Sequence, residues 1–276
     1  MKKKIEVTFW GVRGSIATHK LDRSRYGGHT ACASIFDGEQ YFVCDAGTGI
    51  RFLGQRLLRK KNPIALFLSH LHWDHIFGLP FFEPLYQKKR KIVLAGPQSR
   101  GLTFKKALNT IMRPPFFPIG PVEWNSHVHW MNLKPKKMKL GNVRIECRWV
   151  RHTDPTLGYK FIFSADKKII YVSDQELKKN DPQFLKWIQG ADLLIHDAQY
   201  DPKKYAKYKG WGHSSFEDVL RLAIKAKVKK LVLFHHDPDS TDPLLQRRAD
   251  WCQKFLKKNR SSTKCLLAKE GLTLRI

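Results

Sequence analysis

The sequence lacks the cysteine pattern of a disulfide-stabilised protein. It contains five cysteines, which is an odd number, and no two of them stand at the CxxC spacing. Disulfide frameworks use paired cysteines and form in oxidising compartments. We therefore expect five reduced thiols that serve as packing, in a protein of the cytoplasm.

The sequence also lacks a long apolar run. No window approaches the roughly 18 consecutive apolar residues that a membrane-spanning helix needs. The first ten residues begin with lysines, as a signal peptide does, but they then include Glu6 and alternate polar with apolar residues. This pattern predicts a first β-strand rather than a signal peptide, and we expect no membrane partner.

Acidic residues are scarce. The chain has 24 aspartates and glutamates against 51 lysines and arginines, which gives a formal net charge of +27. Such an excess suits a polyanionic partner, because lysine and arginine neutralise phosphates. The basic residues are scattered rather than clustered, which favours a solvated basic surface instead. In both cases the charge should attract anionic substrates.

Short apolar strands dominate the 276 residues, a length that fits a single domain over 1–276. Runs rich in branched and aromatic residues predict strands at Ile5–Trp10, Tyr41–Cys44, Ile64–Ser69, Lys91–Ala95, Val143–Val150, Lys160–Phe163, Ile169–Val172, Leu193–Ile195, Leu231–Phe234 and Cys265–Leu267. Helical patterns fall at Gly49–Lys60, Ser215–Ala226 and Pro243–Lys258. This order predicts a layered α/β fold, with two sheets face to face and helices outside.

The segment Thr103–Trp124 is rich in proline, and Arg113 begins a run of Pro-Pro-Phe-Phe-Pro. Proline removes a backbone donor and restricts the residue before it. We expect no regular structure here. Two interpretations remain open, a loop at the mouth of the site and a simple connector.

The segment Ser69–His75 carries the chemistry. It follows an apolar strand and contains His70, His72, Asp74 and His75. Alternation along an extended chain should place His70 and His72 on one side, and the turn that follows should bring Asp74 and His75 back to the same space. Three imidazoles and a carboxylate are a donor set that suits zinc.

These residues resemble the His-x-His-x-Asp-His signature of the metallo-β-lactamase superfamily. The resemblance covers nearly the whole chain, and the segments that begin at Phe9, Tyr26, Asp45, Gly210 and Leu233 are similar to its phosphodiesterase-like branch. That branch includes tRNase Z and bacterial cyclic-nucleotide phosphodiesterases. The resemblance implies an αββα sandwich of two mixed sheets, with the site at one edge.

The resemblance also implies a dinuclear metal site. One zinc ion would be held by His70, His72 and His152, the other by Asp74, His75 and His235, and Asp174 would bridge the two. His236 is the rival of His235, which is preferred because it adjoins the apolar strand. The same ligand set tolerates manganese or iron. Asp45 is expected to orient a ligand or a backbone turn.

The resemblance implies hydrolysis of a phosphodiester by attack of a hydroxide that bridges the metals. An aspartate at position 174 argues against a β-lactamase, in which a cysteine is expected. Asp197 and His213 resemble the pair of tRNase Z that acts on the leaving group, with His213 as proton donor. Together with Asp74, which is also a ligand, they are the expected catalytic residues.

The identity of the substrate is less strongly constrained. The resemblance to tRNase Z implies a tRNA-clamping arm between His152 and Asp174, but only 22 positions separate them. This spacing favours a small anionic phosphodiester such as a cyclic nucleotide. The alternatives are a tRNase Z-like or other nuclease acting on RNA or DNA, and a nucleotide sensor without turnover. Relatives of this kind often form homodimers.

Two further features bear on the substrate. A nucleotide base needs an aromatic surface to stack on, and the candidates are Trp73, Phe116, Phe117, Tyr159, Tyr200 and Trp211. The sequence also departs from the family pattern: His29 stands where asparagine is common, and His152-Thr-Asp-Pro replaces His-Pro-Gly. These departures keep the ligands and put the shape of the pocket in doubt.

Overall fold

Two seven-stranded β-sheets face one another in the computed structural model, which describes residues 4–276. Most of the basic run at Lys2–Lys4 therefore lies outside the described residues. In order across the first sheet, the strands are β14 (Thr273–Arg275), β1 (Glu6–Gly11), β2 (Cys32–Phe36), β3 (Tyr41–Cys44), β4 (Ile64–Phe67), β5 (Lys91–Pro97) and β6 (His127–Leu133). The second sheet contains β13 (Lys264–Leu267), β12 (Lys230–Phe234), β11 (Leu193–Asp197), β10 (Lys168–Val172), β9 (Thr156–Ile162), β8 (Val143–Val150) and β7 (Lys136–Leu140).

Both sheets are mixed. Strands β3 to β6 run parallel in the first sheet and β10 to β13 in the second, while the other pairs are antiparallel. Parallel neighbours need a crossover connection, usually a helix, and helices separate several of these strands. The predicted αββα sandwich is confirmed.

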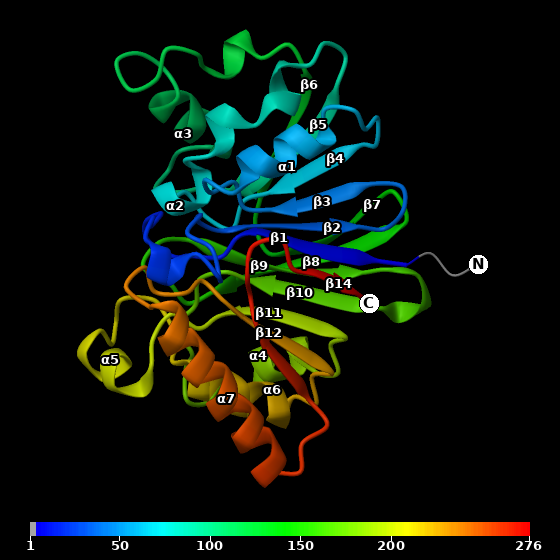
Figure 1. Cartoon of the computed structure of the whole chain (residues 1–276). Helices are drawn as coiled ribbons and strands as arrows, with labels where there is room; N and C mark the ends of the chain where they lie inside the picture. The colour runs from blue at the N-terminus through cyan, green and yellow to red at the C-terminus, as the bar shows by residue number, and fades with distance from the viewer. Residues whose placement is uncertain (1–3) are drawn as a thin grey trace.

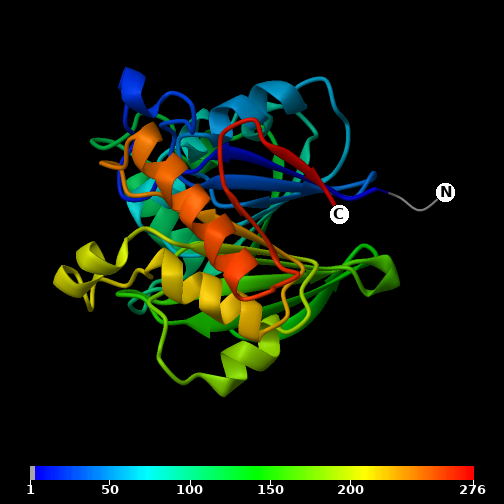
Figure 2. The same ribbon diagram turned by 60° about the horizontal axis from the view of Figure 1, so that its bottom comes forward.

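Helices cover the outer faces of the sandwich (Figures 1 and 2). The α-helices are α1 (Ile50–Leu57), α2 (Trp73–Ile76), α3 (Phe104–Ile111), α4 (Pro182–Ile188), α5 (Pro202–Lys207), α6 (Phe216–Lys225) and α7 (Asp242–Lys258). Helices α1 and α3 pack on the first sheet, and α4, α6 and α7 pack on the second. None of the helices in the described residues is long and apolar enough to cross a membrane.

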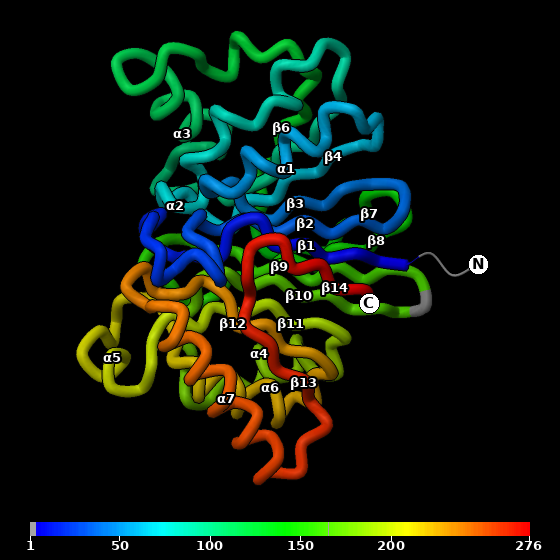
Figure 3. Tube along the Cα trace, in the orientation of Figure 1, coloured from blue at the N-terminus to red at the C-terminus, as the bar shows by residue number. Residues whose placement is uncertain are grey.

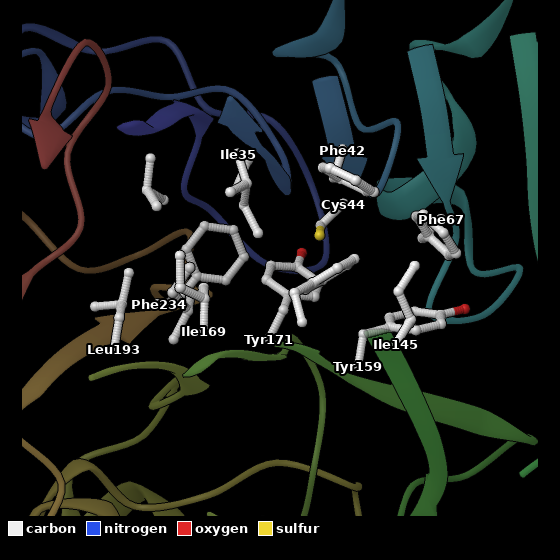
Figure 4. Packing of buried hydrophobic residues seen from close by; sticks show 14 of the residues in the cluster. Ile35, Phe42, Cys44, Phe67, Ile145, Tyr159, Ile169, Tyr171, Leu193 and Phe234 are labelled. Atoms are coloured by element: carbon white, nitrogen blue, oxygen red, sulfur yellow. The ribbon is translucent and has the colours of Figure 1, made fainter. Parts of the chain in front are cut away.

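The main core lies between the sheets. Figure 4 shows Phe42 and Phe67 of the first sheet facing Tyr159, Tyr171 and Phe234 of the second, and all five are fully buried. Rings such as Phe67 and Tyr159 lie 5.3 Å apart between centroids, within the range of favourable aromatic pairs. This core fixes the two sheets relative to one another, and with them the loops at their ends.

The strands that carry the predicted ligands all end at one edge of the sandwich. Strand β4 ends at Phe67 in the first sheet, and β8, β10 and β12 end at Val150, Val172 and Phe234 in the second. Figure 3 places α2, which follows β4, at the left end of the sandwich and the C-terminus toward the right. Loops from both sheets therefore meet at the α2 end.

The structure corrects the expectation for Thr103–Trp124. The segment from Phe104 to Ile111 forms α3, whose first turn is capped by Thr103 Oγ1, an acceptor for Lys106 N at 3.3 Å. The buried side chains of Phe104 and Leu108 join the core outside the first sheet. The prolines follow the helix instead of preventing it, so the prediction was wrong for these eight residues.

All ten predicted strands and all three predicted helices coincide with elements of the structure. The prediction missed the strands β2, β6, β7 and β14, and it missed the helices α2, α3, α4 and α5. Strand β7 shows no apolar strand pattern, because three lysines stand among its five residues. Between His152 and Asp174 lie only β9, a short 3-10 turn at Ser164–Asp166 and β10, so no arm is inserted there.

Candidate active site

The signature segment lies where β4 leaves the sheet. His72 keeps an extended backbone (φ −65°, ψ 150°) at the N-cap position of the short helix α2, which contains Asp74 and His75. The extended stretch brings His70 and His72 to the same space, and their ring centroids lie 4.3 Å apart. The helical turn then brings the Asp74 and His75 side chains back toward them.

One group of imidazoles consists of His70, His72 and His152. Their nearest ring nitrogens all lie within 4.8 Å of one another. His72 Nδ1 and His152 Nε2 lie 3.2 Å apart. His152 comes from the loop after β8, so this group joins the two sheets.

A second group consists of Asp74, His75 and His235. His75 Nε2 lies 3.2 Å from His235 Nε2, and Asp74 Oδ2 lies 3.2 Å from the first of these nitrogens and 3.1 Å from the second. His235 adopts a left-handed backbone conformation (φ 58°) directly after β12. Its neighbour His236 turns away and pairs its Nε2 with the carbonyl oxygen of Ala268 at 2.8 Å.

Asp174 lies between the two groups. Its Oδ1 is 3.1 Å from His75 Nε2 and 3.3 Å from His235 Nε2. Its Oδ2 is 3.8 Å from His70 Nε2 and 3.7 Å from His152 Nε2. The carboxylate therefore presents one oxygen to each group, which is the arrangement that a bridging ligand requires.

The cluster fits divalent metal ions. His70 Nε2 and Asp174 Oδ1 are buried polar atoms without a hydrogen-bond partner, and such atoms are costly unless something satisfies them. A tetrahedral zinc ion with ligands at about 2.0–2.1 Å holds neighbouring ligand atoms about 3.3 Å apart. The distances of 3.1–3.3 Å among the second group and the Oδ1 atom of Asp174 match that spacing.

Each histidine of the cluster uses its other ring nitrogen to contact a polar group. The contacts are His70 Nδ1 to Ser69 Oγ (2.9 Å), His72 Nε2 to Asp154 Oδ2 (3.1 Å), His75 Nδ1 to Asp45 Oδ2 (2.8 Å), His152 Nδ1 to the Gly212 carbonyl (2.9 Å) and His235 Nδ1 to Gln199 Oε1 (2.9 Å). Such contacts fix the tautomer and the orientation of metal-binding imidazoles.

Among the polar groups that contact these histidines, Asp45 accepts several further hydrogen bonds. It is fully buried and has a left-handed backbone (φ 61°). Besides His75, its carboxylate accepts hydrogen bonds from Ser69 N at 2.7 Å, Ser69 Oγ at 2.9 Å and Tyr171 Oη at 2.8 Å. The expected role of Asp45 as an orienting group agrees with this geometry.

The electrostatics of the cluster follow from burial and mutual contact. Burial raises the pKa of the Asp174 carboxyl, but the surrounding imidazoles of His235 and His75 outweigh it and hold that pKa well below its ordinary value. Burial lowers the pKa of His70 well below its ordinary value, and neighbouring His75 acts in the same direction. The ionised form of Asp174 and the neutral form of His70 are thus favoured, and these are the forms in which the two groups can bind a metal.

The predicted acid–base pair is also brought together. His213 Nδ1 lies 2.9 Å from Asp197 Oδ2, and 3.8 Å from Asp174 Oδ2. Asp197 additionally accepts hydrogen bonds from the backbone N–H groups of Gln175 and Gln199, each at 3.0 Å. The carboxylate is therefore fixed by the chain, and it holds the imidazole at the margin of the cluster.

A pocket of about 410 Å³ opens over the cluster. It is lined by Ser15, Leu71, His72, Trp73, Asp74, Asp174 and His213. Trp73 is 73% exposed, and among the other base-stacking candidates Phe116 and Trp211 are exposed too. Tyr159 and Tyr200 are buried, so the structure rules them out as stacking surfaces.

Three residues that had no role assigned from the sequence are brought to the cluster by the fold. Asp154 contacts His72, and Arg100 Nε donates to Asp154 Oδ1 at 2.8 Å. Ser15 N donates to Asp74 Oδ2 at 2.7 Å. The departure His152-Thr-Asp-Pro was the available signal for Asp154, and it had been treated only as a change in pocket shape.

A family model and several known proteins match this chain. The model of the β-lactamase superfamily domain matches residues 40–236. Ribonuclease Z of Sulfurisphaera tokodaii is 26% identical over 247 residues, which cover 73% of this chain and 79% of that protein.

Two solved structures share the fold. The metallo-β-lactamase fold protein YhfI from Bacillus subtilis has a TM-score of 0.75 at 17% identity, covering 99% of this chain and 100% of that one. The short form of human tRNase Z has a TM-score of 0.69 at 19% identity, covering 98% of each chain. The family match spans well over half of the sequence and includes the signature segment, so this chain belongs to the metallo-β-lactamase superfamily and is a metal-dependent hydrolase.

Proposed function

We propose that this chain is a dinuclear metal phosphodiesterase that cleaves RNA. The observation that carries the proposal is the cluster itself, in which the two oxygens of Asp174 face two groups of ligands. Two ions that share a carboxylate suit the in-line displacement of a phosphodiester.

The ligand assignment is part of this proposal. His70, His72 and His152 would hold one ion, Asp74, His75 and His235 the other, and Asp174 would contribute to both. We take His235 rather than His236 as the last ligand, because His235 Nε2 lies 3.1 Å from Asp74 Oδ2, whereas His236 Nε2 is occupied by the Ala268 carbonyl. When bound, the ions would activate water and neutralise charge on the phosphoryl oxygens.

The protein groups would position the substrate and move the proton. A phosphoryl group in the pocket over the cluster would lie beside His213, which lines that pocket. Asp197 holds the Nδ1 side of the ring, which leaves Nε2 to donate a proton to the departing oxygen. Asp74 would serve in the same centre as a ligand, held by the backbone N–H of Ser15.

Two observations favour RNA over a cyclic nucleotide. Relatives that cover most of this chain carry the name ribonuclease Z, and the chain has a formal net charge of +27. A strongly basic protein attracts polyanions more than it attracts a ligand with one phosphate. These points support the nuclease alternative over the cyclic-nucleotide hypothesis that the sequence favoured.

A small phosphodiester remains the second candidate, because the pocket over the cluster is small, about 410 Å³. That volume lies near the lower end of the range for ligand pockets, about 300–1,000 Å³. It would accommodate one nucleotide beside Trp73, which lines the pocket and is 73% exposed.

The test compares cleavage of substrates that differ in their leaving groups. Zinc-loaded protein would be assayed on RNA, on 2′,3′- and 3′,5′-cyclic nucleotides and on bis(p-nitrophenyl) phosphate, with His213→Ala beside the wild type. We expect RNA cleavage, and we expect His213→Ala to lower it by about 10²–10⁴-fold because the ribose oxygen needs a proton. Nitrophenolate departs without a proton, so the cleavage of bis(p-nitrophenyl) phosphate should be slowed far less by this substitution.

Each outcome decides between the candidates. Turnover of a cyclic nucleotide with no RNA cleavage would replace the main proposal with the second one. Equal losses of His213→Ala on RNA and on bis(p-nitrophenyl) phosphate would refute the role of His213 as proton donor. Metal binding by titration, followed for His72→Ala and His235→Ala, checks the ligand set independently of turnover.

A further inference from the structure

A groove of about 850 Å³ lies next to the cluster, roughly twice the volume of the pocket above it. Its walls come from the loop after β5 (Gln98, Arg100, Gly101), the link between β6 and β7 (Asn132–Lys136) and the loop from Trp149 to Thr156. His152 belongs both to this wall and to the first group of ligands. The groove therefore borders the first group of ligands and runs between β6 and β7, the edge strands of the two sheets.

The alternation of side chains along β8 explains why the groove is open. Val143, Ile145 and Cys147 point to one face of the strand and are buried in the core between the sheets. Trp149 continues the same face but is 41% exposed. The facing sheet no longer covers this end of the strand, and an aromatic surface is left at the groove wall.

The groove is strongly basic. It is lined by four cationic side chains, Arg100, Lys134, Lys136 and Arg151, and by a single carboxylate, Asp154. Asp154 is already engaged by Arg100 and His72. Among the described residues no salt bridge involves the other three cations, so their charges are available to an anionic ligand.

The register of β7 shows which lysines face the groove. Lys136 lies opposite Cys147, and Met138 lies opposite Ile145, so Lys136 shares the inward face of the strand with Met138, which packs against the core. Lys137 and Lys139 alternate to the other face. The strand therefore offers a matched pair of lysines that point away from the groove.

We propose that this groove binds the single strand of RNA that continues from the scissile phosphodiester, and this inference rests on the proposed function. The free cations would contact successive phosphates, and the exposed indole of Trp149 would stack on a base. Positive grooves with aromatic platforms are how proteins hold single-stranded nucleic acids. Because His152 belongs to the wall, the track would pass beside the cluster.

The test compares two double variants that remove the same charge. Lys134→Ala/Lys136→Ala removes groove cations, and Lys137→Ala/Lys139→Ala removes two from the opposite face of the same region. Both are made in the zinc-loaded His213→Ala protein, which slows cleavage, and binding of a fluorescent single-stranded RNA is followed by anisotropy from 50 to 200 mM salt.

We expect the groove variant to weaken RNA binding about five- to thirtyfold, because each exposed ion pair contributes modestly. The slope of log affinity against log salt should become shallower by about 1.4, which is about 0.7 for each phosphate of the single strand that a lysine no longer neutralises. The control variant should change neither. Equal effects of the two variants, or none, would overturn the proposal.

Trp149→Ala separates RNA from other polyanions. It should weaken binding of RNA more than binding of inorganic polyphosphate, which has no bases to stack. An acidic peptide bound as tightly as RNA and equally sensitive to Trp149→Ala would instead indicate a protein partner and overturn the proposal. Because the assay measures binding, it stands if RNA is not cleaved, an outcome that would refute only the proposed function.

Discussion

Replacing Asp45 with asparagine should weaken the affinity of the cluster for divalent metal about 10- to 100-fold, although the side chain never touches the ions. The carboxylate accepts the Nδ1 proton of His75 at 2.8 Å. This contact keeps the proton on Nδ1 and leaves the Nε2 lone pair, which lies 3.2 Å from Asp74 Oδ2, free for a metal.

An asparagine at position 45 would reverse the tautomer preference of His75. An asparagine tolerates the left-handed backbone of position 45, φ 61°, and its carbonyl oxygen can still accept from Ser69 N. Its amide NH₂, however, would occupy the site of Oδ2 and would face the Nδ1–H group of His75. Two donors cannot form a hydrogen bond with each other, so His75 would move its proton from Nδ1 to Nε2. A proton there competes directly with the metal, and the expected loss corresponds to about 1.4–2.7 kcal/mol.

The assay is a competition titration of metal-free protein against a chromogenic zinc chelator, with urea unfolding to check that the variant folds. Tyr171→Phe is the control, because it removes one donor to Asp45 at 2.8 Å but leaves the contact with His75. We expect that control to change the affinity by less than about threefold, as loss of a neutral hydrogen bond outside the ligands implies. A folded Asp45→Asn protein with wild-type affinity would refute the tautomer argument.

Three other changes probe the site and the core. Asp154→Asn should weaken metal binding about tenfold, measured by the same titration, and wild-type affinity would show that its contact is incidental. Gly212→Ala should destabilise the protein by more than about 1–2 kcal/mol in urea unfolding, because φ is +87° and the new Cβ would lie 2.2 Å from His152 Nδ1. Gly210→Ala is the control: its φ is +92° but its Cβ would lie in open space, so this variant should show the backbone cost alone. Burial raises the pKa of the Cys147 thiol from 9.0 to about 12, so the folded state disfavours the thiolate. The stability from this thiol is present below pH 9 and is lost as the pH rises toward 12, by about 1.4 kcal/mol per pH unit, and urea unfolding of Cys147→Ala should lack this loss.

The strands that bury both faces were readable from the sequence. Residues 193–195 and 231–234 are continuous apolar runs, and all of these residues are buried. Strand β7 was missed because it lies at a sheet edge, where lysines occupy the solvent face and the pattern becomes basic. Helix α2 is only four residues long, too short to show a helical period.

The residues of the cluster could be predicted from the sequence, but the contacts that position their side chains could not. The donors His70 to His75 are local in sequence, and their spacing alone indicated a metal site. The contact of Asp154 with His72 joins positions 82 apart, and that of Arg100 with Asp154 joins positions 54 apart. Such contacts depend on how two loops approach in space, which no local pattern specifies.

The position of the cluster between the sheets has a consequence for the whole molecule. His70, His72, Asp74 and His75 follow a strand of the first sheet, whereas His152, Asp174 and His235 follow strands of the second. Ions bound there would cross-link the two halves of the sandwich through both ligand groups. Metal that binds only the folded chain stabilises it by mass action, so the lifetime of this protein would depend on the supply of free metal, and starvation for the ion would remove the enzyme as well as its activity.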